Sequence, residues 1–192
     1  MAGRADELYS FAYRGLLTRE AIGDQRQISG SRMKAEHIAA RLPIDEVDEV
    51  FIEPAQEMAV VYTAIAAFEN SARDFVEKRL IEEVGADWWE KCLNEKRRKK
   101  AESRLEEENR IRWHATRGDS LLQYTEIADL SSIIVTNHDY FVAIVPDPEW
   151  AKQIFKTLER SRNIIMHSGY LEAEDIERLG MALRDWYAQV GG

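Results

Sequence analysis

The chain has 192 residues, 45% of them hydrophobic and 32% charged, which indicates a folded globular protein of about one domain rather than a disordered one. Its formal net charge of −9 argues against a general nucleic-acid coat but leaves a local basic site open. The single cysteine excludes an intrachain disulfide and a cysteine-based zinc cluster. Because no apolar leader and no apolar run of membrane length is present, we expect a cytoplasmic protein with no membrane partner.

Two helices and an acidic segment are expected in the N-terminal quarter of the chain. A candidate helix over residues 5–22 precedes a polar loop over residues 23–30, and a second helix over residues 31–42 is stopped by Pro43. The acidic segment 44–53 alternates in polarity, so it is either a short strand or an irregular arm.

The most regular helical pattern follows Pro54, which suits the first turn of a helix, and Gly85 is placed to end it. Its apolar residues recur at spacings of three and four, which predicts a packing seam: Met58, Val61, Ile65, Phe68, Ala72 and Phe75. We therefore expect an N-terminal helical segment over residues 1–50 and a helical domain over residues 51–192.

Four further helices are expected downstream. The first covers residues 88–113 and carries a basic run, and the second covers residues 125–141. The third has a strong start signal, an aspartate followed by a proline, and covers residues 147–168, with Gly169 ending it in a left-handed conformation. A last helix covers residues 173–190. The sequence therefore predicts an all-α, antiparallel helical bundle.

Positive charge is concentrated in one segment, residues 91–117, which holds ten Lys or Arg against five Glu. Its densest part, together with Arg104, could guide RNA, or it could be a solvated helix face or a contact for an acidic partner: Lys96, Arg97, Arg98, Lys99 and Lys100. Trp113, beside Arg112 and His114, could stack a base or belong to the core at a helix end.

The most informative motif is the hexapeptide 162–167, because it joins a fixed cation, Arg162, to a titratable base, His167. Together these groups could cleave a phosphodiester, although they could also simply cap a helix end. At about 100° per residue, His167 shares a face with Asn163 and lies about 140° from Arg162. The helix therefore distorts, the arginine stem swings round, or a second copy completes the site. The other histidines have no metal-ligand spacing, so we expect no metal.

The stretch 159–168 resembles the signature of HEPN domains (higher eukaryotes and prokaryotes nucleotide-binding), in which a histidine follows an arginine after four to six residues. Arg162, Asn163 and His167 match this signature without a gap. Other segments resemble one branch of the family, named after a yeast nuclear endoribonuclease of mRNA surveillance: 67–75, 88–89, 124–130 and 137–141. The resemblance covers about residues 55–190.

The resemblance implies a helical bundle that forms a homodimer, in which two motifs make one composite site. It implies metal-independent and cofactor-free cleavage of RNA by Arg162, Asn163 and His167, leaving a 2′,3′-cyclic phosphate. It also puts Glu69 and Arg73 near the site as supporting residues, although their spacing equally fits an ordinary ion pair. Bacterial members often act as toxins or in anti-phage defence, which implies a separate inhibitor or defence partner.

Two other functions stay open. The chain could be a catalytically silent HEPN module that binds a protein partner or RNA. It could also be a plain helical interaction subunit whose acidic segment 44–53 docks a basic partner.

Overall fold

The computed structural model describes residues 35–191, and its contacts divide the chain into two units at the boundary between Asp48 and Glu49. The predicted helix over residues 5–22 and the loop over residues 23–30 lie outside the described residues.

The first unit contributes two short described elements. The helix α2 (Ala35–Ala39) falls inside the predicted helix 31–42, and the 3-10 turn η1 (Ile44–Glu46) follows it. The acidic segment 44–53 is therefore neither a strand nor an irregular arm. Its first residues form η1, and its last residues begin the next helix, since an acidic first turn complements the positive end of a helix dipole.

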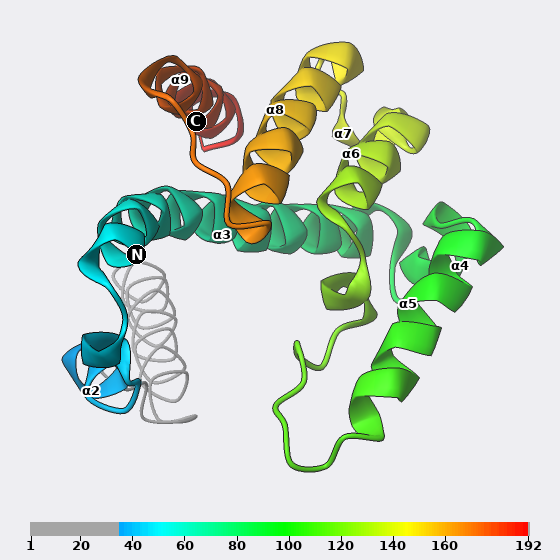
Figure 1. Ribbon diagram of the computed structural model, residues 1–192. Coiled ribbons are helices and arrows are strands. Elements are labelled where there is room, and N and C mark those ends of the chain that lie inside the picture. The colour runs from blue at the N-terminus through cyan, green and yellow to red at the C-terminus, as the bar shows by residue number, and fades with distance from the viewer. Residues whose placement is uncertain (1–34, 192) are drawn as a thin grey trace, which may run out of the picture. The chain divides into compact units, whose positions relative to one another are not determined.

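The second unit is built from helices, and none of residues 35–191 forms a strand, which confirms the predicted all-α bundle. In chain order its elements are α3 (Glu49–Val84), α4 (Trp88–Cys92), α5 (Glu95–Asn109), the 3-10 turn η2 (Leu121–Tyr124), α6 (Ile127–Thr136), α7 (His138–Phe141), α8 (Pro148–Met166) and α9 (Ala173–Val190). The long helix α3 crosses under the later helices, and α8 lies between α6 and α9 (Figure 1).

The predicted seam of α3 forms the base of the hydrophobic core. Four of its six residues are buried, Val61 and Phe75 are partly buried, and the seam continues to Val76 and Leu80. Phe68 meets Phe155 of α8 and Trp186 of α9 edge to face, with ring centroids 5.3 Å and 5.6 Å apart. This aromatic cluster fixes α8, which carries the 162–167 motif, against α3.

The ends of α3 match the sequence signals only in part. Gly85 ends the helix, as predicted, and its φ of 88° places it in the left-handed conformation. The helix begins earlier than predicted, at Glu49, and Pro54 lies inside it rather than in its first turn. A proline this close to the start of a helix removes only one backbone hydrogen bond, and the packing of the long buried seam compensates for the lost bond.

Two predicted helices are each split by an asparagine. Asn94 caps α5 by accepting a hydrogen bond from the backbone N of Arg97 at 2.9 Å, so the expected helix 88–113 becomes α4 and α5. Asn137 separates α6 from α7, because its Nδ2 donates to the carbonyl of Cys92 at 3.0 Å and to that of Ile133 at 2.8 Å. Asparagine side chains compete with helix backbone in this way.

The start of α8 agrees with its sequence signal. The Asp147 carboxylate accepts hydrogen bonds from the backbone N of Glu149 and Trp150 at 2.9 Å and 3.1 Å, and Pro148 occupies the first turn.

The end of α8 differs from the prediction. His167 is the C-cap, and Ser168, not Gly169, takes the left-handed conformation with a φ of 60°. The backbone N of Gly169 donates to the Ile164 carbonyl at 2.8 Å, and that of Ser168 to the Ile165 carbonyl at 3.0 Å, which is a Schellman motif. Gly169 is needed for close approach, since a Cβ there would lie 2.8 Å from the Ile164 carbonyl oxygen.

Candidate active site

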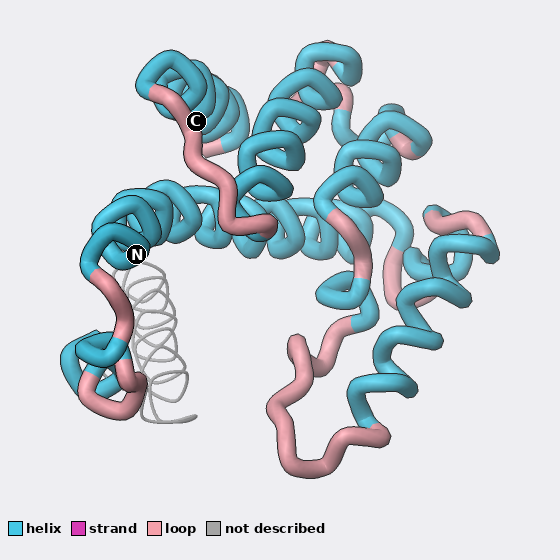
Figure 2. Tube along the Cα trace, viewed as in Figure 1, coloured by secondary structure: helices cyan, strands magenta, loops and turns pink. Residues whose placement is uncertain are grey.

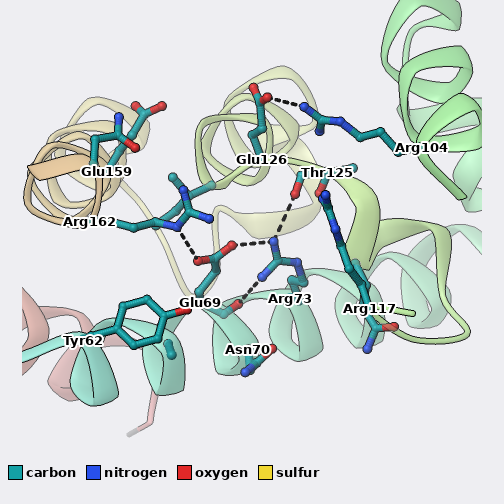
Figure 3. Close-up of a pocket in the computed structure, with 14 residues that line it drawn as sticks. Tyr62, Glu69, Asn70, Arg73, Arg104, Arg117, Thr125, Glu126, Glu159 and Arg162 are labelled. Carbon is teal, nitrogen blue, oxygen red and sulfur yellow. Dashed lines mark hydrogen bonds and ion pairs between the residues drawn. The ribbon is translucent and has the colours of Figure 1, made fainter. Parts of the chain in front are cut away.

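A pocket of about 720 Å³ opens between α3, α6, α8 and the segment around η2. Its charged lining comes from segments far apart in the sequence and gathers around Glu69 of α3 (Figure 3). The charged residues are Glu69, Arg73, Arg104, Arg117, Glu126, Glu159 and Arg162.

Glu69 is the ionic centre of this pocket. Its side chain is only 15% exposed, and its Oε1 lies 2.6 Å from Nη2 of Arg73, four residues along α3. Its Oε2 lies 3.4 Å from Nε of Arg162, which comes from α8. One carboxylate therefore holds both guanidinium groups and links the two helices (Figure 3).

The two arginines differ in burial and in the number of hydrogen-bond partners. Arg73 is 12% exposed and donates hydrogen bonds to the carbonyls of Leu122 and Thr125, at 3.2 Å and 3.0 Å, so it ties α3 to the η2 segment. Arg162 is 35% exposed, and among the residues that the structure describes only its Nε has a partner. Its η nitrogens are therefore available to an anion in the pocket.

The structure separates the two ends of the motif. Arg162 and Asn163 both line the pocket, whereas His167 is exposed at the C-cap of α8 and is not among the described residues that line it. Helical phasing expected His167 to be distant from Arg162, and it paired Asn163 with His167. The pocket instead gathers Asn163 with Arg162.

His167 is bordered by an apolar surface. Its neighbours Met166 and Ser168 line a second pocket of about 590 Å³ together with Phe51 and Tyr170. Phe51 is 71% exposed, and Met166 is 53% exposed. The Tyr170 hydroxyl donates a hydrogen bond to the Glu57 carboxylate, which raises the pKa of Tyr170 and ties the segment after α8 to the start of α3. Tyr62 lines both pockets, so they are neighbours.

The predicted RNA-binding run is largely used in ion pairs. Nε of Arg97 lies 3.1 Å from Oδ1 of Asp129, and Nζ of Lys99 lies 2.6 Å from Oε1 of Glu95. Lys96 is exposed. Arg98 is half-buried, and its Nε has no hydrogen-bond partner within residues 35–191.

Lys100, the last residue of the run, lies nearer the pocket. Its Nζ is 2.9 Å from Oε1 of Glu126, the same oxygen that accepts a hydrogen bond from Nη2 of Arg104. The hydrogen bond from Arg104, followed by that from Lys100, holds the pKa of Glu126 below its ordinary value of 4.5. None of the five residues of the run lines the pocket, so any contact with RNA would lie outside it.

The family model described as Swt1-like HEPN matches residues 63–191 of the chain. The chain belongs to the Swt1-like HEPN family. HEPN domains of this type are generally ribonucleases, and the match includes the whole 162–167 motif. No curated protein and no solved structure shows a significant match to the chain.

Two further arginines of this HEPN domain line the pocket: Arg104, which the sequence grouped with the basic run, and Arg117, which no sequence signal singled out. Arg104 donates to the Tyr124 carbonyl at 2.9 Å, and the Arg117 guanidinium lies over the Tyr124 ring, 5.8 Å from its centroid. The Nε of Arg117 lies 2.6 Å from Oε1 of Glu108. Both belong to the basic segment, but their place in the pocket depends on contacts across twenty or fewer residues that no helical spacing encodes.

Over the part of the chain that the structure describes, no group of three or more His, Cys, Asp or Glu could hold a metal ion, and no helix is long and apolar enough to span a bilayer. Cys92 is buried, and desolvation raises the pKa of its thiol, so a thiolate nucleophile is disfavoured there.

Proposed function

We propose that this HEPN protein is a metal-independent endoribonuclease. The observation that carries the proposal is the partly exposed Arg162, held by Glu69 at the edge of a polar pocket, with Asn163 beside it and His167 at the end of the same helix. A guanidinium so held can bind a phosphodiester through its η nitrogens and stabilise the charge that grows in the transition state.

The chemistry needs a proton carrier as well as an anion site. The 2′-oxygen of the ribose attacks phosphorus, the bond to the 5′-oxygen breaks, and the products are a 2′,3′-cyclic phosphate and a 5′-hydroxyl. His167 takes the proton of the 2′-hydroxyl or supplies the proton of the leaving 5′-oxygen, since imidazole exchanges protons near neutral pH. Asn163 orients the phosphate or the imidazole.

We also propose that the working enzyme is a homodimer with a composite site. His167 does not line the pocket that holds Arg162, so one chain lacks a complete set of groups around a single point. The apolar surface around Phe51, Met166 and Tyr170 flanks His167 and would be covered by a second copy.

In the cell we expect this activity to be that of a toxin, an anti-phage defence protein or a stress effector in the cytoplasm. An active ribonuclease of this kind needs restraint, so a separate inhibitor or defence-system partner is part of the proposal. The support is the family alone.

The deciding experiment is cleavage of a total RNA pool in EDTA by the wild type, Arg162→Ala and His167→Ala. Cleavage by the wild type alone, with 2′,3′-cyclic phosphate ends, is expected. Removing either group should lower the rate by a factor of about 100 or more. The control is Arg160→Ala, which should cleave normally. Arg160 is an exposed arginine of the same helix and does not line the pocket that holds Arg162. Activity that requires a divalent metal or survives His167→Ala refutes the mechanism.

The second candidate is a catalytically silent HEPN module that binds RNA or a partner. It is favoured by the separation of His167 from the pocket and by the engagement of Arg162 with Glu69. Binding of RNA with no cleavage of any pool, by a protein that is dimeric in solution, would select it.

A further inference from the structure

A long loop joins α5 to η2 (Figure 2), and it carries an unusually exposed tryptophan. Trp113 is 86% exposed, the highest value for any large hydrophobic side chain between residues 35 and 191. The expectation that it belongs to the core is therefore wrong. Removing so large an apolar side chain from water is strongly favourable, so a surface that displays it is suited to binding.

The neighbours of Trp113 are cationic. The segment 110–117 contains three arginines and a histidine but no Asp or Glu, in a chain whose net charge is −9. The ring of His114 meets the indole at 80°, with centroids 5.7 Å apart, and Ile111 is the only other large hydrophobic residue of the segment. An aromatic ring among cations suits a nucleobase joined to phosphates, because the ring can stack on the base while the guanidinium groups bind the phosphates.

The same loop reaches the candidate active site. Arg117 lines the pocket with Arg162 and Asn163, and two contacts with Glu108 fix it: the Nε ion pair at 2.6 Å and a backbone hydrogen bond at 3.0 Å. Trp113 and Arg117 are four positions apart in the sequence, so their Cα atoms lie at most about 14 Å from each other. A strand of a few nucleotides can therefore contact both the indole and the pocket.

We infer that Trp113 is a stacking subsite for an unpaired base of single-stranded RNA, and that Arg117 guides the adjoining phosphate toward Arg162. The inference rests on the proposed function, because it takes the bound RNA to be the substrate. It adds a substrate class: a base inside a duplex has no free face to offer the indole, so single strands and loops are preferred over blunt duplexes.

The test uses the full-length His167→Ala protein, which cannot turn over the probe, in EDTA. The probe is a fluorescein-labelled single-stranded RNA of mixed sequence, about twelve nucleotides long. Anisotropy should show roughly 5- to 100-fold weaker binding for Trp113→Ala, and binding within about threefold of the parent for Trp113→Phe, because phenylalanine still stacks. Ile111→Ala, an aliphatic control in the same loop, should bind normally.

Salt dependence separates the two contacts. Arg117→Gln should reduce the slope of log affinity against log salt by about 0.7, whereas Trp113→Ala should lower affinity without changing the slope. The same sequence annealed as a blunt duplex should bind with no dependence on Trp113.

Equal affinity of the parent and Trp113→Ala for the single strand overturns the inference, as does failure of the parent to bind it. A change in oligomeric state for Trp113→Ala, with RNA affinity intact, would make the indole a protein contact and also overturns it. The proposed nuclease activity is refuted by a different outcome. If binding depends on Trp113 but the wild type does not cleave RNA, the stacking subsite is supported and the enzymatic function is wrong.

Discussion

Glu69 shows how a single carboxylate can serve both stability and the candidate chemistry. Glu69→Gln removes the charge that Arg73 and Arg162 share and leaves the 12%-exposed Arg73 without its counterion. We expect a loss of about 1–3 kcal/mol in the free energy of unfolding, measured with urea, since the pair is largely but not fully buried.

The matched control for Glu69 is on the same helix. Asp74 pairs with Lys78 at the same i,i+4 spacing, but the two side chains are 59% and 65% exposed. Asp74→Asn should therefore change the free energy of unfolding by less than about 0.5 kcal/mol. Equal losses for the two variants would contradict the role assigned to burial.

Glu126 makes a prediction about pH. Its hydrogen bonds to Arg104 and then Lys100 lower its pKa in the folded chain below the ordinary 4.5. A depressed folded-state pKa gives stability that is present above pH 4.5 and is lost as the pH falls through the lowered value. The stability difference between wild type and Glu126→Gln should therefore shrink in urea titrations below pH 4.5. A difference that does not vary with pH would show that the ion pairs do not act through this carboxylate.

At the scale of elements, a substitution at the end of α8 should increase the stability of the protein. Ser168 holds a φ of 60°, a conformation that disfavours residues with a Cβ. Ser168→Gly should raise the free energy of unfolding by about 0.5–1 kcal/mol, because relief of this strain exceeds the added freedom of the unfolded chain. Thermal unfolding measures the change.

The adjacent glycine provides the opposite control. Gly169→Ala should destabilise the protein, since its Cβ would meet the Ile164 carbonyl oxygen at 2.8 Å and backbone cannot easily yield. Stabilisation by Gly169→Ala, or no effect of Ser168→Gly, would contradict the Schellman geometry.

Elements could be predicted where their signals are local. The seam of α3, its end at Gly85 and the Asp147 cap depend only on neighbours in sequence, and all three are confirmed. The breaks at Asn94 and Asn137 were not predicted. Asn137 breaks its helix by bonding to Cys92, 45 residues away, and helical propensity contains no information on such a contact.

The candidate site was likewise predictable only where its contacts are local in sequence. The spacing of Arg162, Asn163 and His167 is visible in the sequence, and so is the i,i+4 relation of Glu69 and Arg73. That Glu69 also binds Arg162, 93 positions later, depends on how α8 packs on α3 and could be learned only from the fold.

At the scale of the whole molecule, the position of His167 outside the pocket is the strongest reason to expect a second copy. A C₂ dimer places the same apolar surface of both chains in contact, and it brings each His167 toward its symmetry mate. Completing the site between chains would also explain why exposed apolar residues such as Phe51 and Met166 flank the polar side chain proposed to carry the proton.

Subunit exchange tests this arrangement directly. Arg162→Ala and His167→Ala are each expected to be inactive, but unfolding and refolding them together produces mixed dimers that hold one intact arginine and one intact histidine on different chains. If the site forms between chains, activity should return to roughly a quarter of the wild-type rate, since half of the dimers are mixed and each keeps one of the two Arg162–His167 pairs of the composite site. Refolding each variant alone controls for recovery caused by the procedure. An inactive mixture would mean that Arg162 and His167 act within one chain, and the composite site would then be wrong.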